Sequence, residues 1–303
     1  FDVLVDGDPT AEPNEAFFVN VTNVTNAIPT DGQGLGTITN DDFTRIHDIQ
    51  GPGPSSPIVG ASVTTRGIVP GVRSNGFYIQ EPDATVDADP ATSEGIYVFT
   101  NSAPPAAAAV GNLVQVTGTV AEYVPSADPQ QPPLTEITSP AVVLVSSGNP
   151  LPSATPLTAT FPDPAGPFDQ LERVEGMRVS VASMTVVAPT MGSVNEANAT
   201  GSSNGTFYGV VTGVARPFRE AGIRPSDAPP TGSIPPIPRW DGNPELLSVG
   251  SDGLTGTTLV NVSTGATIAN VVGPLDYTFR YYRILPEATL VPTGGKTPTP
   301  AAI

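Results

Sequence analysis

The sequence contains no cysteine and a single histidine, His47, and these two absences exclude several classes of protein. Without cysteine there is no disulfide framework, no thiolate metal site and no cysteine nucleophile. With one histidine, a catalytic centre built on a pair of histidines is impossible, and the chain carries neither a G-x-S-x-G elbow nor a Walker loop. We therefore predict that this chain is not an enzyme and contains no catalytic residues.

Long helices and long apolar runs are also missing. The 36 prolines and 31 glycines would interrupt any long helix, because proline breaks the helical ladder and glycine weakens it. No apolar run approaches the roughly 18 residues that a membrane-spanning helix needs, so we predict no membrane insertion. The 38% of hydrophobic residues is still enough to build cores.

What the sequence does contain is a series of short runs rich in Val, Ile, Thr and Tyr, separated by clusters of Gly, Pro and Asp. Such runs are typical of half-buried strands. The clearest are 61–72 continuing into 77–80, 95–100 and 113–123. The one helix that we predict covers 168–174. The expected fold class is therefore all-β.

Basic residues are scarce in the first half of the chain. Residues 1–147 hold 17 acidic residues against three arginines, whereas residues 148–303 hold 12 acidic against nine basic residues. Binding to nucleic acid normally requires lysine and arginine to replace counterions, so the first half is a poor phosphate binder. It is better suited to cations. The alternative is that its acidic residues only keep the surface soluble.

A series of sequence words in residues 47–123 carries a family resemblance. In order, they are HDIQG, SP followed by G and VTTRGIV, NGFYIQEP, TSEGIYVFT and VGNLVQVTGTVAEY. They resemble the OB-like β module that precedes the catalytic domain in secreted bacterial nucleases of the endonuclease/exonuclease/phosphatase family. The words LERVEGMRVSV, GVARPFREAGI, IPRWDGNPELLSV and VVGPLDYTFRYYRILPE extend this resemblance over most of residues 44–293. It implies a secreted or cell-surface bacterial protein whose partner, a catalytic domain of the same polypeptide, lies beyond Ile303.

The N-terminal segment carries a second resemblance. FDVLVDGDPTAEPNEAFFVNVTNV followed by GQGLGTITNDD resembles the second half of a Calx-β domain, which is an Ig-like sandwich. The resemblance implies a calcium site at five carboxylates, Asp8, Glu12, Glu15, Asp41 and Asp42. Calcium takes six to eight oxygen ligands, which carboxylates on loops at one end of a sandwich can supply. We expect Ca²⁺ as a cofactor here, the alternative being that these acids only solvate loop ends.

A further acidic cluster, EPDATVDADPATSEG, lies inside the OB-like module. Its weaker calcium candidates are Asp83, Asp87 and Asp89. The cluster lacks the D-x-D-x-D-G pattern with a closing glutamate that marks a calcium loop, so an ordinary hydrated β-loop is the alternative. His47, at the start of the HDIQG word, is predicted to have a structural hydrogen-bonding role.

Six arginines interleaved with aromatic residues lie between positions 216 and 283. Arginine beside aromatic rings suits contact with phosphates and bases. We predict contact with DNA or RNA through five residues, namely Arg216, Arg219, Arg224, Arg239 and Trp240. The alternative is structural ion pairing with acids that are near in sequence, namely Glu220, Asp227, Asp241, Glu245 and Asp276.

These observations divide the chain into four parts. They are the C-terminal half of a Calx-β domain (1–43), an OB-like β module (44–150), a second OB-like or barrel-like module with a long irregular excursion (151–293) and a linker (294–303). The expected function is that of a non-catalytic accessory region of a secreted nuclease, a calcium-stiffened spacer that positions nucleic acid for the downstream hydrolase domain. The alternative is a calcium-dependent segment for cell-surface adhesion or matrix binding.

Overall fold

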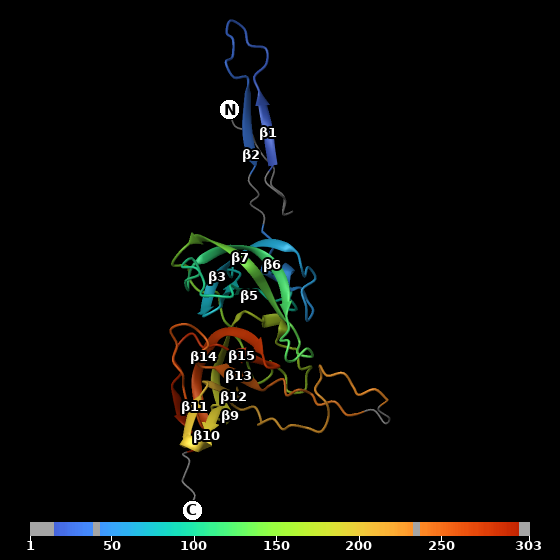
Figure 1. The fold of residues 1–303 in the computed structure, drawn as a ribbon, viewed down its shortest axis with the longest axis vertical. Helices are drawn as coiled ribbons and strands as arrows, with labels where there is room; N and C mark the ends of the chain where they lie inside the picture. Colours follow the sequence, from blue (N-terminus) through green and yellow to red (C-terminus); the bar gives the residue numbers. More distant parts are fainter. Residues whose placement is uncertain (1–14, 39–42, 233–236, 297–303) are drawn as a thin grey trace, which may run out of the picture. The chain divides into compact units, whose positions relative to one another are not determined.

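The computed structural model describes residues 15–38, 43–232 and 237–296, and almost all of their regular structure is strand (Figure 1). The prediction of an all-β fold is therefore confirmed. The short helical segments are α1 (Ile46–Gln50) and two 3₁₀ turns, Glu172–Val174 and Glu196–Asn198. Of the helix predicted over 168–174, the structure contains only the 3₁₀ turn Glu172–Val174. Within the described ranges, no helix has the length and apolar character needed to cross a bilayer.

Residues 1–44 and residues 45–303 form two compact units. In the first unit, β1 (Glu15–Asn20) and β2 (Gln33–Ile38) pair as an antiparallel hairpin in which Phe18 lies opposite Leu35. Both of these side chains are exposed. A two-stranded hairpin is at best marginally stable alone, because it has no second layer against which to bury such residues.

The calcium site predicted for this unit falls almost wholly outside the part of the chain that the structure describes. Asp8, Glu12, Asp41 and Asp42 lie outside the described residues, and only Glu15, an exposed residue at the start of β1, falls within them. Calcium binding by this unit therefore stays a prediction.

The second unit begins with a closed five-stranded barrel. Its strands are β3 (Ser62–Arg73), β4 (Gly76–Gln80), β5 (Gly95–Phe99), β6 (Leu113–Tyr123) and β7 (Leu134–Ser146). They follow the order β3-β4-β5-β7-β6, with β5 and β7 parallel and the other neighbours antiparallel. In β6 the side chains of Val114, Val116 and Val120 alternate into the core, where Ile46 and Ile49 of α1 join them. This is the five-stranded Greek-key barrel of an OB-like module.

A second barrel follows, within a seven-stranded sheet. The strands are β8 (Thr155–Pro156), β9 (Arg178–Ala188), β12 (Thr206–Val211), β13 (Leu247–Gly250), β14 (Ala266–Thr278), β15 (Tyr281–Ile284) and β16 (Pro292–Gly294). Because β14 pairs with both β15 and β9, the strands β9-β12-β13-β15-β14 close into a ring. β13 and β15 are parallel and the other neighbours in the ring are antiparallel. The ring thus repeats the order and directions of the first barrel.

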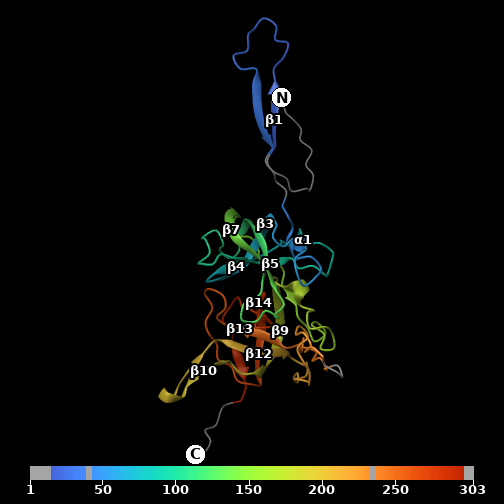
Figure 2. The same cartoon turned by 45° about the vertical axis from the view of Figure 1, so that its right-hand side comes forward.

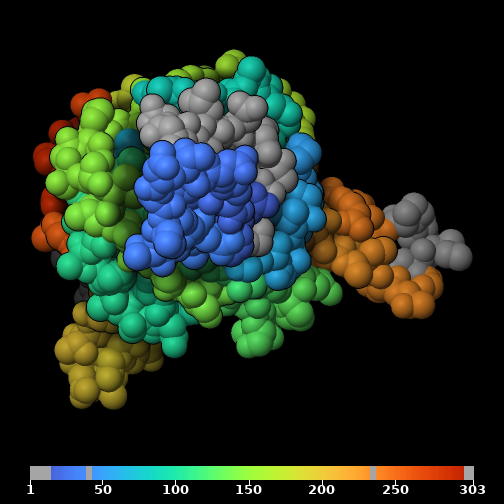
Figure 3. All heavy atoms as spheres, turned by 90° about the horizontal axis from the view of Figure 1, so that it is seen from above, coloured from blue at the N-terminus to red at the C-terminus, as the bar shows by residue number. Residues whose placement is uncertain are grey.

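Two insertions distinguish the second barrel from the first. A hairpin of β10 (Gly192–Asn195) and β11 (Thr200–Ser203) separates β9 from β12, and it projects from the barrel in Figure 2. An excursion over 212–246 separates β12 from β13, and its orange part extends away from the barrels in Figure 3. In the first barrel, the equivalent connection between the second and third strands is the acidic loop 81–94.

The two barrels touch through buried polar groups and through a close approach of their backbones. Gly95 of β5 lies against Gly176, which precedes β9, so closely that a Cβ at Gly95 would meet backbone atoms of Gly176 and Met177 at 2.4 Å. Tyr78 of β4 donates a hydrogen bond to Asp276 of β14, with 2.8 Å between the oxygens. These contacts fix the second barrel on the first.

Buried glutamates lie beside this contact. Burial raises the pKa of Glu136 to about 7 and that of Glu172 to about 7, and it raises the pKa of Glu175 well above its ordinary value. Glu172 accepts a hydrogen bond from Tyr282 at 2.8 Å, and Glu175 accepts one from the amide of Thr135 at 3.2 Å. One carboxylate oxygen of Glu175 has no partner in the described structure, so its protonated form is favoured.

The free energy of unfolding is therefore expected to fall as the pH rises from about 4.5 to about 7. In this window the folded chain holds protons on Glu136 and Glu172 that the unfolded chain, with a pKa near 4.5, has released. Each group withdraws up to about 1.4 kcal/mol per pH unit, and less where solvent screens its charge. Urea unfolding at a series of pH values measures the slope. The Glu136→Gln, Glu172→Gln double variant should flatten it, and an unchanged slope would contradict the assignment.

Candidate nucleic-acid interface

The excursion between β12 and β13 is closed at its base by backbone hydrogen bonds. The amide of Ile223 donates to the carbonyl of Pro238 at 3.0 Å, and the amide of Trp240 donates to the carbonyl of Ile223 at 2.9 Å. The guanidinium of Arg239 donates to the carbonyl of Pro225 at 2.6 Å. Arg239, one of the predicted contact residues, therefore ties the two arms of the excursion together and holds the neighbouring side chains near the barrel.

Trp240 is the centre of the arrangement. Its side chain is buried, and its indole N–H donates to the Asn243 side-chain oxygen at 2.8 Å. The Arg219 guanidinium carbon lies 4.0 Å from the centre of the Trp240 rings, and that of Arg224 lies 5.8 Å away. A guanidinium at such distances is attracted by the electron-rich ring face. Trp240 therefore orients two arginines and does not itself offer an open face to a base.

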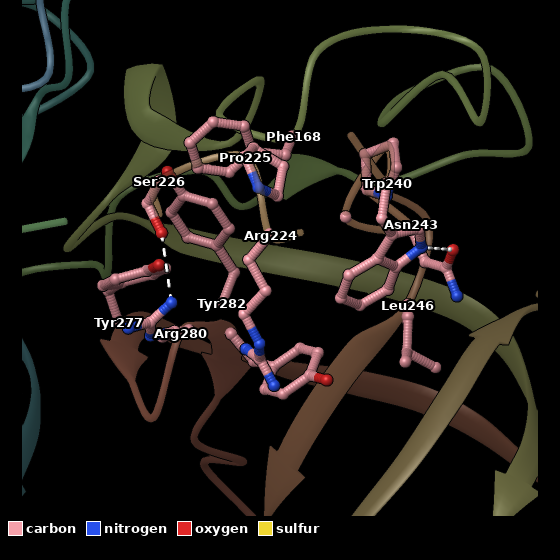
Figure 4. A pocket seen from close by; sticks show the side chains of 13 residues that line it. Phe168, Arg224, Pro225, Ser226, Trp240, Asn243, Leu246, Tyr277, Arg280 and Tyr282 are labelled. Atoms are coloured by element: carbon pink, nitrogen blue, oxygen red, sulfur yellow. Dashed lines mark hydrogen bonds between the residues drawn. The ribbon is translucent and has the colours of Figure 1, made fainter. Parts of the chain in front are cut away.

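The arginines line two adjoining pockets on the outside of the second barrel. Figure 4 shows Arg224 in the middle of the first, with Trp240 on one side and Tyr282 on the other. The second pocket has a volume of about 340 Å³ and is lined by Arg216, Arg219 and residues of the barrel wall. The two pockets share four lining residues, namely Trp240, Asn243, Leu246 and Tyr281. A volume of this size is in the range of pockets that hold small organic groups.

Barrel tyrosines form the floor of the second pocket. Tyr208 of β12 and Tyr281 of β15 stand edge to face, with 5.2 Å between their ring centres. Arg224 lies 5.8 Å from the Tyr281 ring. In the sequence, Phe218 and Tyr281 are among the aromatic residues interleaved with the arginines, but the five predicted contact residues include neither of them, nor Tyr208. The Phe218 side chain is 80% exposed between Arg216 and Arg219. Alternation does not identify Tyr208, because Thr206 and Val210 on either side of it along the same face of β12 are buried.

The ion pairs set Arg280 apart from four other arginines of this region. Arg280 pairs with Asp128 and Asp227, so the alternative of structural ion pairing holds for this arginine. Among the described residues no ion pair involves Arg216, Arg219, Arg224 or Arg239. Arg219 bonds only to backbone carbonyls, and the guanidinium groups of Arg216 and Arg224 form no hydrogen bond with the described part of the chain. Their charge is available to a ligand.

The structure does not bring the weaker calcium candidates, Asp83, Asp87 and Asp89, together as one group of ligands. Asp83 is engaged by the amide and hydroxyl of Ser153, which hold the pKa of its carboxyl below the ordinary value. Asp89 accepts a hydrogen bond from the Ala91 amide at 2.9 Å. Asp87 lies instead beside His47 and Glu94.

Comparison with known proteins finds a family match, which extends over β7 of the first barrel and the whole second barrel. No curated protein matches the chain. Residues 128–295, more than half of the chain, match the family described as Domain of unknown function (DUF8508). The matched segment begins in the loop before β7 and includes the whole second barrel, the excursion and all five predicted contact residues. The chain therefore belongs to the DUF8508 family.

Proposed function

We propose that this chain is a non-catalytic region that binds a single strand of nucleic acid at the two pockets of the second barrel. The observation that carries the proposal is the grouping of Arg216, Arg219 and Arg224, which form no ion pair within the described ranges, around Trp240 and Tyr281. Arginine recognises phosphate oxygens with paired N–H donors, and aromatic rings stack on bases.

The position of the pockets on the barrel supports this ligand. OB-like barrels bind oligonucleotides on the face of their second and third strands, flanked by the loops between strands 1 and 2 and between strands 4 and 5. Tyr208 lies on the second strand of the ring, whereas the arginines lie on the connection between the second and third strands and extend the site beside this face. The exposed ring of Phe218 adds a surface on which a base can stack.

Charge also favours this location over the first barrel. The chain carries a formal net charge of −17, so most of its surface repels phosphate. In the first barrel Arg73 is paired with Asp276, and Arg66 donates to the side chain of Gln115. The arginines of the excursion are therefore the better site for a phosphate backbone.

The proposed biological setting is the one that the sequence resemblance implies. The chain would be the accessory region of a secreted or surface-bound bacterial nuclease, presenting a DNA or RNA strand to a hydrolase domain of the same polypeptide. Stiffening by calcium belongs to this proposal through the Calx-β resemblance of residues 1–43.

Fluorescence anisotropy with labelled oligodeoxythymidine and the matching RNA tests the proposal. The Arg216→Ala, Arg224→Ala double variant is expected to weaken binding at least tenfold and to lower the salt slope by about 1–2, because two phosphate contacts are lost. Arg173→Ala is the matched control, since Arg173 also lies over an aromatic ring, that of Phe161, but outside the pockets. Unchanged binding in the double variant would refute the site.

Two other results would refute the proposal as a whole. One is the absence of binding to either oligonucleotide at about 50 mM salt, where phosphate contacts are strong. The other is equal or tighter binding of a sulfated polysaccharide, which would favour the matrix-binding alternative.

A further inference from the structure

His47, Asp87 and Glu94 come together where α1 meets the 81–94 loop of the first barrel. His47 Nδ1 lies 3.0 Å from Glu94 Oε2 and 4.0 Å from Asp87 Oδ2. One possible ligand atom from each of the three residues lies within 4.8 Å of the others. α1, labelled in Figure 2, precedes the first strand of the barrel, and the loop follows its second strand, so the fold joins segments about forty residues apart.

The two carboxylates have no fixed positive charge beside them. In the described ranges, neither Asp87 nor Glu94 forms an ion pair with lysine or arginine. Arg45, the neighbouring base, is paired with Glu81. The Glu94 side chain is only 7% exposed, so water does little to compensate its charge. A positive charge at this point, on a protonated His47 or on a bound metal ion, would balance the two carboxylates.

Each carboxylate is held by the backbone so that one oxygen is directed toward the histidine. Glu94 Oε1 accepts the Asp87 amide at 2.9 Å, and Glu94 Oε2 faces His47. Asp87 Oδ1 accepts the Asp89 amide at 2.9 Å, and the Thr92 hydroxyl contacts both oxygens of Asp87. Such outer hydrogen bonds are what orients the ligands in metal sites.

We propose that His47, Asp87 and Glu94 bind a divalent transition metal, with Zn²⁺ as the preferred ion. In a tetrahedral zinc site with bonds of about 2.0–2.1 Å, ligand atoms lie about 3.3 Å apart. The observed separations of 3.0 and 4.0 Å bracket this value, so small side-chain movements complete the geometry. A set of one imidazole nitrogen and two carboxylates suits zinc, whereas calcium selects oxygen ligands alone. Three protein ligands leave a fourth position for water.

The site shares Asp87 with the weaker calcium candidate predicted from sequence but differs from it in the other ligands and in the ion, and it does not depend on the proposed nucleic-acid interface. Bound metal would fasten α1 to the 81–94 loop. The purely structural hydrogen bond predicted for His47 accounts for its contact with Glu94, and Asp87 is then only a loop residue that accepts the Asp89 amide. The two explanations make different predictions for added metal.

Calorimetric titration of the chelator-treated full chain with ZnCl₂ distinguishes them. We expect one Zn²⁺ per chain, a higher melting temperature with Zn²⁺, and a visible absorption band when Co²⁺ replaces it. His47→Gln and Asp87→Asn should each weaken Zn²⁺ binding at least about 100-fold, because a direct ligand matters more than the outer partners, whose loss costs 10–100-fold. Asp87 is exposed, so its substitution leaves the core of the barrel intact.

Asp89→Asn is the matched control, since it removes an exposed acid of the same loop that lies outside the triad. This variant should bind Zn²⁺ as tightly as the unmodified chain, and circular dichroism confirms that all three variants fold. A stoichiometry of zero would overturn the proposal. So would equal binding by the unmodified chain, His47→Gln and Asp87→Asn, because the metal would then be held by unrelated carboxylates.

Discussion

Asp276→Ala is expected to lower the free energy of unfolding by about 3–5 kcal/mol, the range found when one partner of a buried ion pair is removed. Asp276 is 1% exposed and accepts hydrogen bonds from Tyr78 at 2.8 Å and from Arg73 at 3.1 Å. Its loss leaves the buried Tyr78 hydroxyl with the Arg73 guanidinium as its neighbour and no acceptor, and Arg73 without its counter-charge. Because Tyr78 and Arg73 belong to the first barrel and Asp276 to the second, the contact between the barrels is weakened.

Urea denaturation followed by circular dichroism measures this change. Asp276→Asn should be less destabilising than alanine, because the amide oxygen still accepts the bond from Tyr78. Asp252→Ala, at an exposed turn of the second barrel, is the matched control and should alter stability by less than about 0.5 kcal/mol. A loss below about 1 kcal/mol for Asp276→Ala would show that this network does not fix the barrels together.

Gly95→Ala is expected to destabilise the chain by about 3 kcal/mol, at the upper end of the cost of overpacking. The new methyl group would stand 2.4 Å from the carbonyl carbon of Gly176 and 2.4 Å from the amide nitrogen of Met177. Both are backbone atoms, so no rotation of a flexible side chain can relieve the overlap. The barrels would have to separate locally, which would also disturb the hydrogen bond from the Gln50 side chain to the Gly95 carbonyl.

Thermal and urea unfolding of the Gly95→Ala chain measure the loss. Gly53→Ala is the matched control, because a Cβ there meets nothing within 4 Å and its backbone is not left-handed. It should leave stability unchanged or raise it slightly, since alanine restricts the unfolded chain. Equal stability of the two variants would mean that the barrels are not held at the Gly95–Gly176 approach.

Local sequence patterns were enough to predict the fold class and several strands. The apolar runs predicted over 95–100 and 113–123 correspond to β5 (Gly95–Phe99) and β6 (Leu113–Tyr123). Strand signals of this kind depend on side-chain type and on alternation, which are local properties. The five-residue helix α1 was missed because Ile46–Gln50 is too short for a helical period, and its stability comes from burying Ile46 and Ile49 in the barrel.

The closure of the second barrel could not be predicted in this way. It depends on the pairing of β14 with β9, strands that begin almost ninety residues apart. Nothing in either strand specifies the other, because both are β-rich segments with similar alternation. The excursion over 212–246 further hides the repeat of strand order between the two barrels in the sequence.

For the candidate sites, the sequence by itself determined which chemical groups exist: no thiol, one imidazole, many carboxylates, and arginines interleaved with aromatic residues after position 216. Only the tertiary structure decided which of these groups are engaged. Arg280 is neutralised by Asp128, 152 residues away, while Arg216 and Arg224 have no acidic partner in the part of the chain that the structure describes, and His47 meets Glu94 across 47 residues. Charge and hydrogen bonding act through space, whereas a sequence pattern records only neighbours along the chain.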